Sequence, residues 1–568
     1  MIEAGVAKKD ITYFEDGLGM FGYGMDFHVM KGIKTHLYAR AFVFKNSVSE
    51  KIVFVNVDLM SVSTAVRKGV LKKLQRNYTH LGYNEHNVML TATHTHNGPG
   101  GYSHYAFYNL TIKGFVPKVY NIIVDGIVDA IVNADQSAKP CNIYYGEGNF
   151  EPEKEVAFNR SIKAYNQNPD VEKVNLKNRH LALDRTMSLL RIDALDGTPL
   201  GCLSWFGVHP TNIGNDNFLL CGDNKGYAAS FMEEDSKSPN FVASFPQKPC
   251  GDVSPNFIWS SKRNKMCGKF PDDFESAIYN GKLQFQKAKE IYEQIVKTEP
   301  INNSIDSGLL FVNFTNVTVD PEFAGGKEGE RTGPGAIGVG FMRGTDDGKG
   351  INSLVAVAIN FLVFISKSLD YIKSWFAPVS IKERFIGKYK YQGNKKIIIE
   401  TTERKVLGYT DLRVFPTILD RSVATFRNHY ENGSLGDKPW TPNVLPIQIF
   451  ILGNIAIAGM SGELTTVAGK RLKKTIQDIL CKRGIDKVIL SPYANAYSGY
   501  VTTYEEYQTQ CYEGGHTMYG KWTLAAHQTK FKQLCLEMLK PKKDRVFDNT
   551  VRPVQFSKEE IQKRTRIS

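Results

Sequence analysis

Two histidines separated by one residue are the first feature of this sequence that could support chemistry. His94 and His96 lie in the segment Thr93–Gly101, which reads Thr-His-Thr-His-Asn-Gly-Pro-Gly-Gly. In an extended chain, residues two apart point to the same side, so both imidazoles can face one pocket. The glycines and the proline that follow predict a tight loop. Because imidazole is the commonest metal ligand among side chains, the pair indicates a candidate metal site.

Three further candidate ligands follow other apolar runs of the chain. His209 and Glu463 each come shortly after such a run, and Tyr500 lies beyond a third. In α/β sheets, ligands bind at the carboxyl ends of strands, where these residues would meet. Two histidines, one glutamate and a phenolate are compatible with an open zinc site. The alternative is that each histidine is a hydrogen-bonded core or turn residue, and the spacing alone leaves both interpretations open.

The elements that would position these residues are buried strands alternating with amphipathic helices. Largely apolar runs typical of buried strands are Ile52–Val57, Val88–Thr93, Leu203–Val208, Ile447–Ile451, Ile455–Ala458 and Val488–Leu490. Helical periodicity occurs in Thr64–Tyr78, Val119–Ala134, Ala277–Val296 and Thr465–Leu480. The stretch Asn302–Thr318 alternates in the manner of antiparallel strands. The sequence therefore predicts an α/β fold, a layered mixed β-sheet flanked by helices, with the zinc site at the C-terminal ends of strands.

A strongly apolar segment, Leu354–Ile365, stands apart from this pattern. Its only strongly polar member is Asn360, and its large apolar residues continue one helical face as far as Ile372. A bilayer span needs about 20 apolar residues, so we expect that this shorter segment does not cross a membrane. Two interpretations stay open: a packed core helix, or an interfacial helix beside a pocket mouth that faces lipid.

Composition and charge narrow the class of protein. The chain has 568 residues, 42% of them hydrophobic and 23% charged, which is ordinary for a globular protein. Eight cysteines without a Cys-x-x-Cys pair exclude a disulfide scaffold and a cysteine zinc finger. The net charge of +13 favours anionic partners, and the tail Lys530–Ser568 holds 11 Lys or Arg against 5 Asp or Glu. This tail could be a solvated end, a contact with anionic membrane, or a nucleic-acid contact.

The first residues of the chain bear on its compartment. Met1–Asp10 has no apolar run after a basic start, so we expect no signal peptide in this chain. A cytoplasmic location is then one alternative, and a chain that starts after processing is the other.

Eight segments together resemble the neutral ceramidase family. The most specific is Ala92–Gly101, Ala-Thr-His-Thr-His-Asn-Gly-Pro-Gly-Gly, where the family usually has Ser in place of Asn97. The others, in chain order, are Gly22–Gly24, Phe158–Ser161, Trp205–Thr211, Asp223–Ala228, Gly251–Asn256, Gly462–Thr466 and Tyr497–Tyr512. The resemblance implies a secreted or cell-surface enzyme that hydrolyses ceramide, in membranes or micelles, to a sphingoid base and a fatty acid.

The resemblance also implies roles for particular residues. It implies that one zinc ion per chain is held by His94, His209, Glu463 and Tyr500. It implies that the catalytic residues are Ser254, His96, Arg160 and Tyr512. A second, structural Mg²⁺ or Ca²⁺ ion is compatible with it. Asn159 adjoins Arg160 in an Asn-x-Ser glycosylation sequence, so we expect Asn159 to be buried and unglycosylated.

Two mechanisms use these groups differently. In the first, a water activated by zinc attacks the amide carbonyl, and His96 handles the proton that goes to the leaving amine. In the second, Ser254 is the nucleophile. We prefer the first, because Ser254 lies in a Gly-Asp-Val-Ser-Pro turn, where a serine hydroxyl often only holds the loop.

We therefore expect one large catalytic domain over residues 1–540 and a basic C-terminal segment over 541–568. Members of the family usually continue into an immunoglobulin-like β domain, which is missing or barely begun in this sequence. The alternatives are a related zinc amidase for another N-acyl lipid, an inactive homologue that binds lipid, and, from charge alone, a nucleic-acid protein. We expect an anionic lipid surface rather than nucleic acid as the partner, and the sequence leaves the oligomeric state open.

Overall fold

The largest sheet has eight strands and carries the first of the predicted histidine segments. The computed structural model describes residues 2–48, 50–415, 421–548 and 550–566. The strand order of this sheet is β13 (Val242–Ser244), β11 (Pro199–Trp205), β10 (Thr186–Ala194), β8 (Lys139–Asn149), β1 (Ile2–Asp10), β4 (Tyr38–Asn46), β5 (Lys51–Val57) and β6 (Val88–Ala92). Strand β6 pairs parallel to β5, whereas β4 and β5 are antiparallel. The sheet is therefore mixed, as the sequence predicted.

A second, four-stranded sheet packs against the first. Its order is β17 (Ile305–Asn313), β23 (Val444–Leu452), β24 (Ile455–Met460) and β26 (Lys487–Ser491). Phe54 and Trp205 of the first sheet share one buried cluster with Phe450 and Ile457 of the second. The alternation of apolar side chains along both sheets thus places a core between them. Strand β17 runs antiparallel to β23, which confirms the expectation for Asn302–Thr318.

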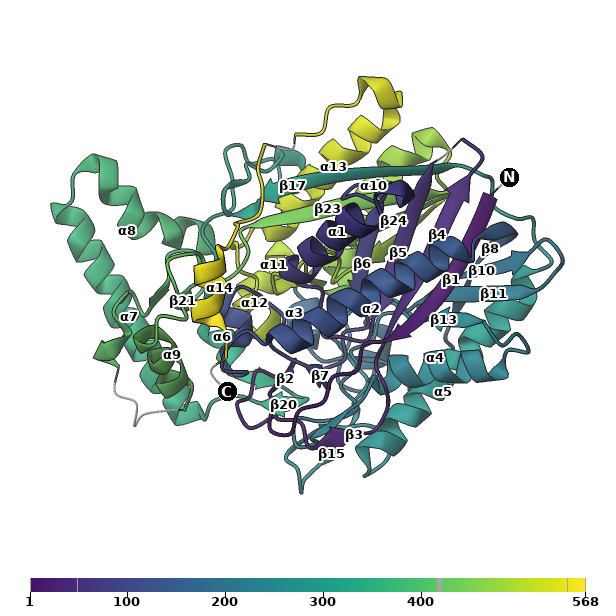
Figure 1. Ribbon diagram of the computed structural model, residues 1–568. Helices are drawn as coiled ribbons and strands as arrows, with labels where there is room; N and C mark the ends of the chain where they lie inside the picture. The colour runs from purple at the N-terminus through teal and green to yellow at the C-terminus, as the bar shows by residue number, and fades with distance from the viewer. Residues whose placement is uncertain (1, 49, 416–420, 549, 567–568) are drawn as a thin grey trace.

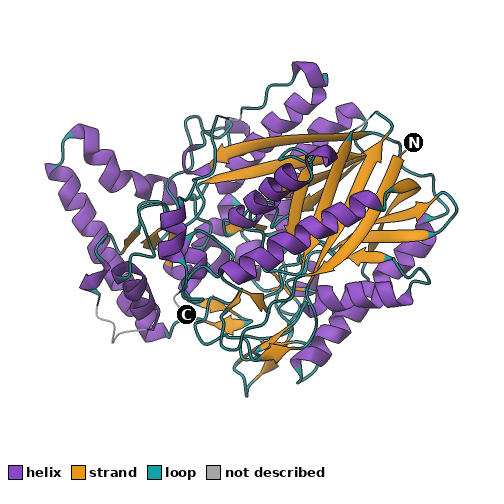
Figure 2. Ribbon diagram, in the orientation of Figure 1, coloured by secondary structure: helices purple, strands orange, loops and turns teal. Residues whose placement is uncertain are grey.

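Helices cover the outer faces of the two sheets, as Figure 2 shows. Helix α2 (Pro117–Gln136) lies over β1 and β4, and helix α1 (Thr64–Asn77) packs against α2. Helices α4 (Asp223–Asp235) and α5 (Asp273–Ile295) lie over the other end of that sheet. Helices α10 (Thr466–Leu480) and α13 (Thr523–Leu539) pack on the four-stranded sheet. Each of these helices buries one apolar face, so the predicted layers of an α/β protein are present.

The strongly apolar segment forms part of a helical hairpin that extends away from the sheets. Helix α7 (Ser353–Phe376) is followed directly by α8 (Val379–Gln392), and Figure 1 shows the pair reaching out at the left of the view. Only 17% of Leu354–Phe376 is buried, so the interpretation as a packed core helix is wrong. The helix is also longer than the apolar segment. Leu354–Phe376 is long and apolar enough to cross a bilayer by length and composition, so the argument that the segment is too short to cross does not hold. The apolar run stops at Ile365, but helical periodicity continues through polar residues.

The basic C-terminal segment returns to the body of the protein. Helix α14 (Lys558–Arg564) ends at Arg564, whose side chain is buried and donates a hydrogen bond to the carbonyl of His104 at 3.0 Å. The backbone of Phe115 donates to the Arg564 carbonyl at 2.7 Å. Helix α14 and the residues up to Arg566 after it are therefore docked, so the interpretation of the whole tail as a free, solvated end is wrong.

Candidate active site

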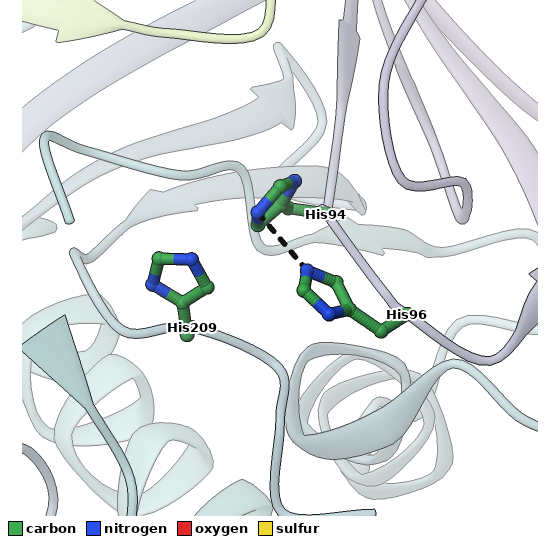
Figure 3. Close-up of side chains that lie close together, drawn as sticks. All are labelled: His94, His96 and His209. Carbon is green, nitrogen blue, oxygen red and sulfur yellow. Dashed lines mark hydrogen bonds between the residues drawn. The ribbon is translucent and has the colours of Figure 1, made fainter. Parts of the chain in front are cut away.

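Three buried histidines meet where two chain segments leave the eight-stranded sheet. Figure 3 shows His94 and His96 from the loop after β6, and His209 from the loop after β11. One ring nitrogen of each lies within 4.8 Å of the others. The Nε2 atoms of His94 and His96 are 3.2 Å apart. The sequence prediction that His94 and His96 face one pocket is confirmed, and His209 joins them.

Backbone carbonyls fix the orientation of His94 and His209. The Nδ1 atom of His94 lies 2.7 Å from the Met60 carbonyl, and His94 itself has a φ of 75°, which turns its side chain inward at the end of the strand. The Nδ1 atom of His209 lies 2.8 Å from the Cys250 carbonyl. A carbonyl only accepts, so Nδ1 carries the hydrogen and Nε2 of each ring presents a lone pair to the centre. Such a tautomer is the one that binds a metal ion.

Glu463 completes this arrangement from the other sheet. It opens the short strand β25 (Glu463–Leu464), and its Oε2 lies 3.4 Å from Nε2 of His94 and 3.3 Å from Nε2 of His209. Ligands around a tetrahedral zinc ion are separated by about 3.3–3.4 Å when the bond length is about 2.0–2.1 Å. The hydroxyls of Tyr493 and Tyr497 also hold this carboxylate. Burial alone would raise the pKa of Glu463, but the two imidazoles, when they carry a proton on Nε2, hold that pKa well below its ordinary value.

The same centre offers two overlapping sets of donors. His94 and His209 belong to both, and the third donor is either Glu463 or His96. Among the described residues, Nε2 of His209 has no hydrogen-bond partner of good geometry, and neither does Nδ1 of His96. A buried nitrogen without a partner is costly, and a metal ion would satisfy it. These residues therefore fit a divalent ion with nitrogen and oxygen ligands.

Tyr500 is placed beside Glu463 by strand pairing. Strand β27 (Tyr500–Val501) runs parallel to β25, with Tyr500 opposite Glu463. The hydroxyl of Tyr500 accepts a hydrogen bond from Nη2 of Arg160 at 3.1 Å. Burial, followed by the charge of Glu463, raises the pKa of Tyr500 well above its ordinary value. Without a metal ion nearby, this phenol therefore keeps its proton, although Arg160 opposes the rise of its pKa.

Arg160 is the hub of a buried polar network. It follows the short strand β9 (Phe158–Asn159), which pairs with β14 (Val253–Ser254). Its Nε donates to Glu513 at 3.0 Å, its Nη2 to the Gly251 carbonyl at 2.8 Å, and its Nη1 reaches Asp347 at 3.4 Å. Its guanidinium also lies over the ring of Tyr512, 5.6 Å from the ring centre. Arg160 is thereby held rigidly with its charge next to Tyr500.

Tyr512 lines the same region. It opens the short helix α12 (Tyr512–Gly515), and its ring centre is 5.5 Å from that of Tyr500. Burial raises the pKa of the Tyr512 phenol, so the hydroxyl stays protonated and can donate a hydrogen bond.

Ser254 is buried next to this network, and its hydroxyl is already engaged in hydrogen bonds. Its Oγ donates to Oδ1 of Asp347 at 2.5 Å and accepts from the backbone of Asn256 at 3.0 Å. Asp347 in turn faces Arg160. In the part of the chain that the structure describes, no histidine hydrogen-bonds to Ser254. This geometry suits a residue that positions Asp347 and, through it, Arg160.

His96 is enclosed on the side away from His94. The ring of Tyr23 lies against it, with ring centres 4.8 Å apart. Gly22 has a φ of 149°, and a Cβ added there would lie 2.4 Å from Cγ of His96. Only glycine therefore fits at this position, which explains the Gly-Tyr-Gly segment singled out in the sequence.

Sequence reasoning missed several residues of this site. Asp347 and Glu513 both hold Arg160, and Tyr493 and Tyr497 both hold Glu463. Glu513 directly follows Tyr512, so its position in the chain could have pointed to it, but Asp347 has no motif around it. The expectation for Asn159 is confirmed in one respect: it is buried, and its side chain donates to Asp252 at 2.7 Å.

Fold and site together define an α/β protein with a buried centre of imidazole and carboxylate donors suited to a divalent metal ion. Comparison with known proteins gives the family. Residues 2–411 and 431–529 match the model of the neutral/alkaline non-lysosomal ceramidase N-terminal region. This chain belongs to the neutral/alkaline non-lysosomal ceramidase family.

Individual relatives agree with this assignment. The neutral ceramidase of Pseudomonas aeruginosa is 36% identical, over 94% of this chain and 72% of its own length. Neutral ceramidase B of Dictyostelium discoideum is 33% identical, over 94% of this chain and 71% of its own. The crystal structure of the Pseudomonas aeruginosa enzyme superposes with a TM-score of 0.76 at 33% identity, covering 97% of this chain and 76% of that one. A ceramidase complexed with C2 superposes with a TM-score of 0.78 at 34% identity, covering 98% and 78%.

Proposed function

We propose that this protein is a zinc-dependent amidase that hydrolyses ceramide to sphingosine and a free fatty acid. The proposed zinc ligands are His94, His209, Glu463 and Tyr500. The observation that carries the proposal is the carboxylate of Glu463, placed 3.3–3.4 Å from the two Nε2 atoms whose opposite nitrogens are tied to carbonyls. Membership of the ceramidase family supports an N-acyl lipid as the substrate.

A zinc ion, when bound, would supply a Lewis acid that polarises the amide carbonyl and makes water a better nucleophile at neutral pH. The catalytic roles that we propose for the protein's own side chains follow from their geometry. Burial, with the neighbouring imidazoles, lowers the pKa of His96 well below its ordinary value. A neutral His96 can accept the proton of the attacking water and pass it to the nitrogen of the leaving amine.

Tyr512 and Arg160 are the proposed groups that stabilise the developing oxyanion. Tyr512 keeps its hydroxyl hydrogen because burial raises its pKa, and Arg160 carries a permanent charge. The side chain of Arg160 is buried and Tyr512 is partly buried against it, so the two need little reorganisation when negative charge develops on the carbonyl oxygen. The network that includes Glu513 and Asp347 is what holds Arg160 ready.

The nucleophile in this proposal is water and not Ser254. The hydroxyl of Ser254 donates to Oδ1 of Asp347, which also faces Arg160, and no histidine hydrogen-bonds to Ser254 in the described part of the chain. Ser254 is therefore proposed as a positioning residue.

The test is hydrolysis of a defined ceramide by the purified protein, with both products identified by mass spectrometry. We expect turnover that a chelator abolishes and added zinc restores. An N-acyl amine without the sphingoid base serves as the control substrate and should be cleaved much more slowly. Absence of ceramide cleavage by zinc-loaded protein, or equal cleavage of both substrates, would reject ceramide as the preferred substrate.

A further inference from the structure

One face of helix α7 exposes a continuous apolar stripe. Its members recur at helical spacing and are Leu354, Val357, Phe361, Phe364, Ile372 and Trp375. Leu354 is 79% exposed, Phe361 63%, Phe364 65% and Trp375 73%. The stripe runs from Leu354 to Trp375 and therefore extends over about 32 Å. Isolated exposed apolar residues are normal in soluble proteins, but a row of this length marks a surface that meets something apolar.

The opposite face of α7 is already occupied by the rest of the protein. Val363 and Ser374 are buried there. Asp370 forms an ion pair with Lys388 of α8 at 2.8 Å and accepts a hydrogen bond from the Tyr389 hydroxyl. The orientation of α7 about its own axis is thus fixed, and the apolar stripe is held outward.

Positive charges flank the apolar stripe. A helix turns by about 100° per residue, which places Lys367 on one side of the stripe and Lys373 on the other. The exposed cations of α8 are Lys382, Arg384 and Lys390. Within the described residues, none of these five side chains has a carboxylate within 4.0 Å. An apolar face bordered by unpaired Lys and Arg is the pattern of a helix that lies in the surface of an anionic bilayer.

The segment that leads into the hairpin, just before α7, lies against residues of the active site. The short helix α6 (Val339–Met342) precedes α7, and its Phe341 packs on Tyr512 with ring centres 4.9 Å apart. Asp347, which faces Arg160 and Ser254, lies in the loop between α6 and α7. Only a short segment of chain therefore separates α7 from residues of the active site, so a surface that binds α7 lies near that site.

We propose that the apolar stripe of α7 docks lengthwise onto an anionic lipid surface, so that the active-site wall rests close to the membrane. This inference deepens the proposed function, on which it rests, by naming the surface from which an insoluble substrate is taken. Charge favours lipid over a second copy of the chain, because two copies joined through this hairpin would bring like charges together. Each Lys or Arg near an anionic surface strengthens binding by about fivefold.

The experiment is sedimentation with phosphatidylcholine vesicles, prepared with and without phosphatidylserine. The wild-type protein should bind the vesicles that contain phosphatidylserine and bind the neutral ones more weakly. The double variant Phe361→Asp, Phe364→Asp should lose at least about tenfold in binding, because two apolar anchors are replaced by charges. The matched control is Leu176→Asp, an exposed leucine outside the hairpin, which should bind as the wild type does. Lys367→Glu with Lys373→Glu should remove the preference for phosphatidylserine.

Separate readouts keep docking distinct from catalysis. Hydrolysis of detergent-dispersed ceramide and the melting temperature should be unchanged in the Phe361, Phe364 variant, because both side chains are exposed. Loss of vesicle binding together with unchanged folding supports the docking surface, whether or not ceramide is cleaved. Equal binding of wild type and variant, no binding of the wild type, or a stable dimer that the same variant dissolves would each overturn it.

Discussion

Each imidazole that faces Glu463 is held from behind by a backbone carbonyl, and this second contact decides what the residue can do. With Nδ1 tied to Met60 or Cys250, the rings of His94 and His209 cannot turn away from the centre. In the metal-free protein, the lone pair of Nε2 of His209 is then buried without a hydrogen-bond partner, which is costly. A metal ion removes that cost, which links the geometry of two residues to the chemistry of the whole site.

The first prediction concerns the ligands. His209→Ala should lose zinc and activity together. The loss of zinc affinity and of activity should be larger than the roughly 10–100-fold loss that follows removal of an outer-shell partner of a metal ligand. Zinc content by mass spectrometry and ceramide turnover are the two measurements. His36→Ala is the matched control, since His36 is an exposed histidine paired with Asp10. Full zinc occupancy in the His209 variant would remove this residue from the ligand set.

The second prediction separates the two possible donor sets. His96→Ala should keep zinc but lose turnover, because His96 is proposed to move a proton and Glu463 to bind the ion. Glu463→Gln should weaken zinc binding. If the His96 variant loses zinc as completely as the His209 variant does, the three histidines are the ligands and the proposed role of Glu463 is wrong.

The third prediction concerns Ser254. If it positions Asp347, then Ser254→Ala and Asp347→Asn should each lower kcat by about 10–100-fold. The double variant should be little worse than either, because both changes weaken the same link from Ser254 through Asp347 to Arg160. Mass spectrometry after rapid quenching should find no fatty-acyl adduct. An adduct on Ser254, or a complete loss of turnover in Ser254→Ala alone, would establish the serine as the nucleophile.

At the scale of elements, the site depends on short paired strands that end in functional residues. Strands β25 and β27 bring Glu463 next to Tyr500, and β9 and β14 bring Arg160 next to Ser254. These pairs are too short to give a periodic sequence signal. The long strands and helices were predictable, because their burial follows a period of two or of 3.6 residues.

The histidine pair and Asp347 show where prediction from sequence succeeds and where it stops. His94 and His96 are two residues apart, so one local conformation determines that they meet. Asp347 is 93 residues from Ser254, and only the tertiary fold brings them together. Helix α7 shows a further limit, since an apolar periodicity predicts a buried face but not whether protein or lipid covers it.

The fourth prediction concerns Gly22. A Cβ at this position would lie 2.4 Å from the His96 ring, so Gly22→Ala should displace that ring. We expect turnover to fall while zinc content stays near that of the wild type, because His96 is not a proposed ligand. Gly24→Ala is the matched control: Gly24 also has a positive φ, but a Cβ there would meet nothing within 4 Å. Unchanged turnover in Gly22→Ala would contradict the role proposed for His96.

At the scale of the whole molecule, the centre joins parts of the chain that are far apart. His94 and His209 follow strands of the eight-stranded sheet, whereas Glu463 follows the four-stranded sheet. Removing the metal should therefore weaken the contact between the two sheets as well as abolish activity. With free zinc about 1,000-fold above its Kd, binding to the native state adds about 4 kcal/mol of stability.

The fifth prediction follows from this linkage. Chelation should lower the Tm of the wild-type protein by several degrees, and adding zinc should restore it. The His209→Ala variant should have the lower Tm at the outset and should not respond to either treatment. A wild-type Tm that is independent of zinc would mean that the ion does not bind across the two sheets.

Anomalous X-ray scattering at the zinc edge, from crystals of the wild-type protein, will show directly whether a zinc ion binds between the two sheets and which residues hold it. We predict a single strong peak within about 2.0–2.2 Å of Nε2 of His94, Nε2 of His209 and Oε2 of Glu463. A peak bound to His96 in place of Glu463, or no peak at this centre in protein that hydrolyses ceramide, would contradict it.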